Sequence, residues 1–269
     1  MDDCSEEELD ELMAEQVVDW FQSSEDGSGI SRGSLLVASM SKVHPRHHYK
    51  TAWKTLDVWR QRVPPVQALT FLPEFAYALS SWLVLADQPI CAAVVLLCYV
   101  GCFRASELLH LTFNNLFLGT QQMVVVLGVA KRGLEQKVVL SNPQVIAWVT
   151  RYVQWLMATD LSTSSYDKVF PISYGKLAYW IRKGMTALQI PGHWTSHGLR
   201  RGGASELFGR QMPLPEIAAF GRWLSERSMR EYLRRGEVAA MRIRKDYPPV
   251  LFRRLAVFAK LGVTVWDAN

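Results

Sequence analysis

The sequence predicts an α+β fold that is mainly helical and carries one small antiparallel three-stranded sheet. Most of the chain shows apolar residues at helical spacing, with proline and glycine marking where helices begin and end. One stretch changes period: Phe113–Leu118, Gln122–Ala130 and Gln136–Leu140 are short, rich in Val, Leu and Phe, and separated by turns. Hydrophobic residues make up 49% of the 269 positions, which is enough for a sizeable core.

Helical patterns fill the first part of the chain on either side of a proline pair. The flexible segment Ser23–Gly29 separates the first two expected helices. At Val63-Pro64-Pro65 the prolines lack a donor N–H and disfavour helix in the residue before them. The helices expected here are Glu6–Phe21, Ser34–Met40, Tyr49–Arg62, Pro73–Ala86, and Pro89–Phe103 continuing into Arg104–Leu111.

The part of the chain after the strands is divided by helix caps. Ser141-Asn142-Pro143 can begin a helix, because proline at the first helical position loses no hydrogen bond. Thr195 or Ser196 can cap another, with Gly209 just past its end. The expected helices are Pro143 to about Met157, Ser173–Leu188, Ser196 to about Phe208, Pro215–Phe220, Glu226–Arg235 ended by Gly236, and one more within Glu237–Asn269.

The proline pair is also the predicted domain boundary. We expect residues 1–66 to hold an acidic leader and a partial helical region, and residues 67–269 to form the larger domain. Met1–Asp26 contains 11 of the 25 acidic residues and no Lys or Arg, so the rest carries 30 basic against 14 acidic residues. This basic body favours a polyanionic partner, although a solvated basic face explains the charge equally well.

Cysteine usage and hydropathy indicate where the protein works. Cys91, Cys98 and Cys102 repeat at helical spacing without a CxxC pair, so we interpret them as core residues in a reducing compartment. The first residues are acidic, which argues against a secretory signal peptide. The longest apolar run, Ile90–Phe103, is too short to span a bilayer. We therefore expect an intracellular protein, not secreted and without a membrane partner.

Two motifs place an arginine three positions from another polar residue. Arg104 lies in an apolar segment, where a buried arginine needs a partner. That partner can be Glu107 or a phosphate, and a structural ion pair is the simpler interpretation. His197 and Arg200 are also three apart, so they share one helix face.

Adjacent glycines follow the second motif. Within a helix, Gly202 and Gly203 each cost about 1 kcal/mol relative to alanine. Such a pair indicates that another backbone or a ligand approaches closely.

Together these motifs resemble the tyrosine recombinase and phage integrase family. Its first box, Arg-x-Ser-Glu-Leu, is matched by Arg104–Leu108, and its second, His-x-Leu-Arg, by His197–Arg200. A His or Trp follows in the family, matched here by Trp223, and then the nucleophile, matched by Tyr232 nine residues later. The resemblance covers Leu69–Gly236, and the Gly-Arg-Trp phrasing is most similar to recombinases of eukaryotic mobile elements.

The family also places a lysine in a hairpin between the two boxes. Lys131 occupies that place, with Arg132 and Lys137 as competitors. The family further carries a helical DNA-binding domain before the catalytic one. Here only about 65 residues precede it, which implies a partial core-binding region over residues 1–66 and a catalytic domain over residues 67–269.

The resemblance implies cleavage and rejoining of DNA through a 3′-phosphotyrosyl bond. A free tyrosine has a pKa near 10, so it needs nearby cations to become a nucleophile at neutral pH. Tyr232 is expected to attack the phosphate, Arg104 and Arg200 to hold its non-bridging oxygens, and Lys131 to protonate the leaving 5′ oxygen. The other expected roles are proton transfer by His197, an indole donor or packing role for Trp223, orientation by Glu107, and DNA-backbone contacts by Arg201, Arg222, Arg227 and Arg230.

The implied partner is double-stranded DNA, bound by a homo-oligomer that is a tetramer on paired sites when active. No cofactor or metal is expected. If the source is a eukaryote, the protein should be nuclear. The alternatives are DNA relaxation of the type IB topoisomerase kind and a decayed, non-catalytic DNA-binding protein from a mobile element. An ordinary core role for Tyr232 or Trp223 also stays open.

Overall fold

A computed structural model describes residues 5–23, 30–62, 69–129, 135–158, 164, 167–223 and 225–265. The chain divides into two compact units, Met1–Gln67 and Ala68–Asn269. The predicted boundary at Val63-Pro64-Pro65 lies outside the described residues. The assignment of the first unit to a partial DNA-binding region stays a prediction.

The first unit is a bundle of three helices around its own apolar core. Val17, Val37 and Leu56 are fully buried there. The carboxylate of Asp10 accepts hydrogen bonds from the backbone N–H groups of Thr51 and Ala52, both at 2.8 Å, and so caps the third helix from the first. The helices are α1 (Glu6–Ser23), α2 (Ile30–Val43) and α3 (Lys50–Arg62).

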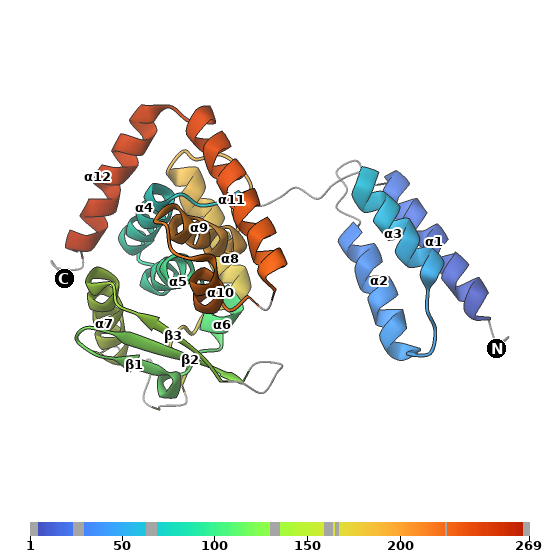
Figure 1. The fold of residues 1–269 in the computed structure, drawn as a ribbon, viewed down its shortest axis with the longest axis horizontal. Coiled ribbons are helices and arrows are strands. Elements are labelled where there is room, and N and C mark those ends of the chain that lie inside the picture. The colour runs from blue at the N-terminus through green and yellow to red at the C-terminus, as the bar shows by residue number, and fades with distance from the viewer. Residues whose placement is uncertain are drawn as a thin grey trace. The chain divides into compact units, whose positions relative to one another are not determined.

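The second unit packs its helices around a larger apolar core, with the sheet at one side beside α7 (Figure 1). Its centre is α5, in which every residue from Cys91 to Tyr99 is buried. Among the described residues, no helix is long and apolar enough to cross a membrane. The helices are α4 (Pro73–Leu85), α5 (Pro89–Val100), α6 (Ala105–Leu109), α7 (Pro143–Ala158), α8 (Tyr174–Ala187), α9 (Ser196–Gly209), α10 (Leu214–Gly221), α11 (Glu226–Asp246) and α12 (Pro249–Val265).

The sheet is antiparallel with strand order β1-β2-β3, as the sequence predicted. The strands are β1 (Leu116–Leu118), β2 (Met123–Val129) and β3 (Glu135–Leu140). The predicted first strand is shorter than expected, because Phe113–Asn115 forms a 3-10 turn. The turn between β2 and β3, with Lys131, lies outside the described residues.

The helix predicted to run from Pro89 through Leu111 is interrupted. It ends at Val100, and Cys102 takes the left-handed conformation with φ 47° before α6 begins at Ala105. Periodicity alone did not reveal this break, because the residues on both sides of it are apolar. The break leaves the carbonyl of Cys102 outside the regular hydrogen bonding of a helix, and this carbonyl becomes part of the site.

Helix α9 is held against two other backbone segments through its glycines. A Cβ at Gly202 would clash with the carbonyl oxygen of Phe71, and one at Gly203 with the carbonyl oxygen of Tyr99. A Cβ at Gly198 would clash with the carbonyl oxygen of Leu69. The close backbone approach inferred from the glycine pair is therefore confirmed, and it fixes the depth of the helix that carries His197 and Arg200.

Helix α11 is longer than predicted and continues through Gly236 to Asp246. Gly236 does not end the helix. A Cβ at this position would clash with the Ser205 hydroxyl on α9. The glycine instead permits α11 to approach α9 closely, which places Tyr232 beside His197.

We expect Gly203→Ala to lower the free energy of unfolding by about 1–3 kcal/mol, because its methyl group would overlap a backbone oxygen that cannot move independently. Gly209→Ala is the matched control in the same helix, since its Cβ would meet no atom within 4 Å. The control should raise the free energy of unfolding by at most about 1 kcal/mol. Urea unfolding measures both, and equal effects of the two substitutions would contradict the packing argument.

Candidate active site

Arg200 lies at the centre of the site and is among the largest fully buried side chains of the described residues, with 2% of its surface exposed. One Nη atom donates to the carbonyl of Cys102 and the other to the carbonyl of Gly221, both at 2.5 Å. Its guanidinium carbon lies 4.6 Å from the ring centroid of Trp223. Burial first, and then Arg104 and Arg222, lower the pKa of Arg200 to about 10, so it stays charged at neutral pH.

Glu107 joins the arginines of the site. Its carboxylate accepts from Arg104 through both the side chain and the backbone N–H, each at 2.7 Å, and from Arg222 at 2.8 Å. The carboxylate also lies 3.9 Å from the Arg200 guanidinium. Burial alone would raise the pKa of Glu107, but Arg222 and the Arg104 hydrogen bonds outweigh it and hold the pKa below 4.5. Arg104 and Glu107 thus form an ion pair, and this pair is also part of the larger arginine cluster.

Tyr232, on α11, reaches the same place from the other side. Its hydroxyl donates to the backbone carbonyl of His197 at 3.4 Å. Its ring centroid lies 5.4 Å from those of both His197 and Trp223, and the Arg201 guanidinium carbon lies 5.3 Å from it. Burial raises the pKa of Tyr232 to about 12, against the opposing effects of Arg200, Arg201 and Arg104. The phenol is therefore protonated at neutral pH.

His197 stands at the first turn of α9, next to the phenol. Partial burial of the ring, followed by Arg201, Arg200 and Arg104, lowers its pKa below the ordinary 6.5. The imidazole is therefore neutral at pH 7 and can accept a proton. No group of three or more His, Cys, Asp or Glu side chains in the described part of the chain could hold a metal ion.

The four arginines predicted for DNA-backbone contacts separate into two pairs. Arg227 and Arg230 are exposed on α11, as such contacts require. Arg201 is 9% exposed and lies over the Tyr232 ring, while Arg222 is 8% exposed and binds Glu107. The buried position of Arg222 differs from the surface position that was expected, because the end of α10 turns its side chain inward.

The structure thus brings together Arg104, Glu107, His197, Arg200, Trp223 and Tyr232. Lys131 is not among them, because it lies outside the described residues, and its role stays a prediction. Sequence reasoning missed the inward position of Arg222. The available signal was its place directly after a helix-ending glycine, where an extended basic side chain can fold back on the helix end.

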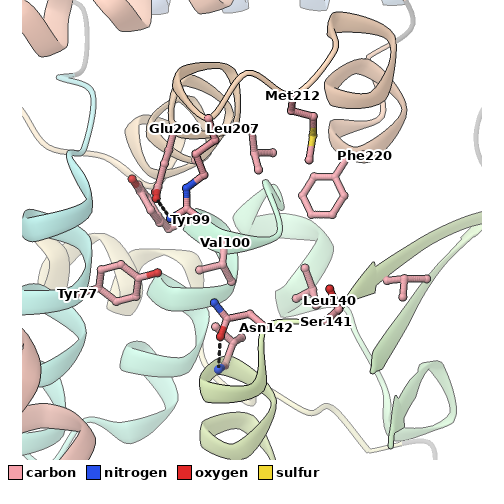
Figure 2. Close-up of a pocket in the computed structure, with 14 residues that line it drawn as sticks. Tyr77, Tyr99, Val100, Leu140, Ser141, Asn142, Glu206, Leu207, Met212 and Phe220 are labelled. Carbon is pink, nitrogen blue, oxygen red and sulfur yellow. Dashed lines mark hydrogen bonds and ion pairs between the residues drawn. The ribbon is translucent and has the colours of Figure 1, made fainter. Parts of the chain in front are cut away.

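A separate hollow of about 240 Å³ lies on another side of α9 and α10. Figure 2 shows Tyr77 and Tyr99 on one side of it, Glu206 above, and Phe220 opposite. None of the gathered site residues lines this hollow. It is therefore distinct from the arginine cluster.

The sequence pattern of the phage integrase family matches residues 86–237, more than half of the chain. With the fold and the clustered motif residues, this match confirms the predicted resemblance: the chain belongs to the phage integrase family. No curated protein sequence matches it.

Several solved structures share the fold. The XerH site-specific recombinase bound to difH has a TM-score of 0.53 and 14% identity, over 68% of this chain and 60% of XerH. The XerA recombinase has a TM-score of 0.53 and 15% identity, over 88% and 90% of the two chains. The Tn1549 transposon integrase with a circular intermediate DNA has a TM-score of 0.52 and 14% identity, over 86% and 82%. This chain thus spans about three fifths of the XerH chain.

We expect Arg201→Gln to raise the pKa of His197, because it removes the cation that lowers this pKa most after burial. NMR titration of the imidazole measures this pKa in both proteins. Arg210→Gln, which changes an exposed arginine just past the end of α9, is the control and should leave the His197 pKa unchanged. A His197 pKa at or above 6.5 in the unmodified protein would contradict the electrostatic description.

Proposed function

We propose that this member of the phage integrase family cleaves and rejoins double-stranded DNA through a covalent 3′-phosphotyrosyl bond to Tyr232. One observation carries the proposal. The Tyr232 phenol on α11 meets the His197 imidazole and the buried Arg200 guanidinium, both on α9. They lie beside Trp223, and the charge of Arg104 also acts on Tyr232.

In the proposed reaction the Tyr232 oxygen attacks the scissile phosphorus and the bond to the 5′ oxygen breaks. The phenolic proton passes to neutral His197, and Lys131 supplies a proton to the leaving oxygen. Attack by a free 5′ hydroxyl on the phosphotyrosine reverses the step, so the bond energy is retained. Trp223 holds the Arg200 guanidinium from one face, which supports a packing role for this residue.

Arg104 and Arg200 are proposed to hold the non-bridging oxygens. A guanidinium carries five N–H donors, and the two backbone carbonyls use one from each Nη of Arg200. Donors therefore remain for an anion. Because Arg200 is 2% exposed, side chains that cover it must shift before a phosphate reaches it. Arg104, whose side chain is 50% exposed, can meet the phosphate first.

The remaining assignments belong to the same proposal. The exposed Arg227 and Arg230 would contact the DNA backbone, and the first unit, Met1–Gln67, would act as a DNA-binding region. The active form would be a homo-oligomer, a tetramer on paired sites. It would work inside the cell, and in the nucleus if the source is a eukaryote.

We expect the protein to form a denaturation-resistant adduct with nicked suicide duplexes, and Tyr232→Phe to abolish it by removing the attacking oxygen. Tyr247→Phe is the matched control, because the Tyr247 hydroxyl donates a hydrogen bond to the Pro191 carbonyl, away from the site. Adducts are counted on denaturing gels. An adduct that persists in Tyr232→Phe would refute the assignment, and DNA binding by the unmodified protein without any adduct would favour the decayed DNA-binding alternative.

We expect the rate of adduct formation to level off towards neutral pH and to fall as the pH drops through the pKa of His197. The sign follows from His197: its pKa is below 6.5, so the proton-accepting form is lost only at lower pH. If Tyr232 instead ionised without a base, its pKa of about 12 would make the rate rise about tenfold per pH unit across the neutral range. A pH–rate profile in single turnover separates these two cases.

A further inference from the structure

Arg222 holds an unusual backbone position at the end of α10. Its φ of 58° and ψ of 43° are left-handed, a conformation that glycine adopts at far lower cost than other residues. A long charged residue is therefore disfavoured by the local backbone. Its side chain is also 4% exposed, so the position is not explained by contact with water.

The side chain of Arg222 makes contacts that offset this disfavoured position. Its Nη2 donates to Glu107 at 2.8 Å and to the Cys102 carbonyl at 3.1 Å, and its Nη1 donates to the Phe220 carbonyl at 3.0 Å. The guanidinium carbon lies 5.0 Å from the ring centroid of Phe103. Two of these acceptors, Glu107 and the Cys102 carbonyl, also lie next to Arg200.

The residues on either side of Arg222 also hold Arg200. The Gly221 carbonyl accepts a hydrogen bond from Arg200, and the Trp223 ring stacks on its guanidinium. The turn Gly221–Trp223 thus contacts Arg200 through a carbonyl and a ring. Arg222 ties that turn to α6 through Glu107, whose carboxylate also binds Arg104.

We propose that Arg222 is a positioning residue, which fixes Arg200 and Arg104 relative to each other through Glu107 and the Gly221–Trp223 turn without touching DNA. This inference rests on the proposed function for its catalytic consequence. It differs from a DNA-backbone contact, which would weaken binding and reduce the salt dependence of affinity by about one unit of slope. A positioning residue changes the rate of cleavage instead.

The test uses Arg222→Gly, which suits the left-handed backbone and removes only the side chain. Gln211→Gly is the matched control, because Gln211 is an exposed residue with φ 64° just past the end of α9. Both substitutions place glycine at a left-handed backbone position, so both remove the same conformational cost. Arg222→Lys keeps a positive charge but cannot bind Glu107 and the Cys102 carbonyl in the same fixed geometry.

We expect Arg222→Gly to slow adduct formation about 100-fold, the cost typical of a small misplacement of catalytic groups. DNA affinity and its salt dependence should stay unchanged, and Gln211→Gly should cleave at the unmodified rate. Arg222→Lys should recover part of the rate. The effects of Glu107→Gln and Arg222→Gly on the rate should be less than additive when the two are combined, since the substitutions share the Arg222–Glu107 contact. If Arg222→Gly does not fold, the rate of adduct formation and the DNA affinity of Arg222→Lys test the proposal in its place.

An unchanged rate, a fall in DNA affinity with a smaller salt slope, or additive effects of the two substitutions would each overturn the inference. A second readout needs no catalysis: the hydrogen-exchange rate of the Arg200 guanidinium, followed by ¹⁵N NMR without DNA. Exchange should quicken in Arg222→Gly and not in Gln211→Gly. If the unmodified protein forms no adduct, the proposed function fails, and this exchange measurement alone supports or overturns the positioning role.

Discussion

The site depends on the cost of burying the Arg200 guanidinium. A charge removed from water must be compensated by hydrogen bonds and opposite charge. Here two carbonyls, an aromatic face and a carboxylate surround it, and they come from two chain segments, Cys102–Glu107 and Gly221–Trp223. Each segment must therefore be placed accurately for Arg200 to be buried at all. The same arrangement leaves the cluster rich in positive charge, with Arg104, Arg200 and Arg222 around the single Glu107 carboxylate.

The backbone meets this requirement through close approach. Glycines 202 and 203 let α9 rest directly on the carbonyls of Phe71 and Tyr99, and Gly236 lets α11 rest on α9. The break at Cys102 supplies a carbonyl that a continuous helix would have used internally. Because backbone atoms cannot rearrange as side chains do, the contacts of Gly202 and Gly203 with the Phe71 and Tyr99 carbonyls set the position of Arg200 more tightly than apolar packing would.

Much of this was predictable from the sequence. The sheet, the two motif helices and the meaning of the glycine pair followed from periodicity and helix propensity. Of the expected catalytic residues, those in the described part of the chain lie together, while Lys131 is outside it. The break at Cys102, the continuation of α11 through Gly236 and the inward turn of Arg222 did not follow. Each involves a contact with a segment distant in sequence: Cys102 with Arg200, Gly236 with Ser205 and Arg222 with Glu107. A local pattern can mark the end of a helix, as Gly221 does beside Arg222, but it does not identify the distant partner in such a contact.

The electrostatics of the site also restrict how Tyr232 can be activated. Arg200, Arg201 and Arg104 favour the phenolate, yet burial outweighs them and the pKa is about 12. A bound phosphodiester would add a negative charge and cancel part of the arginine field, which disfavours a free phenolate further. Ionisation of the phenol ahead of the attack is therefore opposed by burial and, once DNA is bound, by the phosphate charge as well. The phenol can lose its proton most readily as its oxygen bonds to phosphorus, when the charge moves onto oxygens that the arginines hold, and neutral His197 beside the ring is placed to accept that proton.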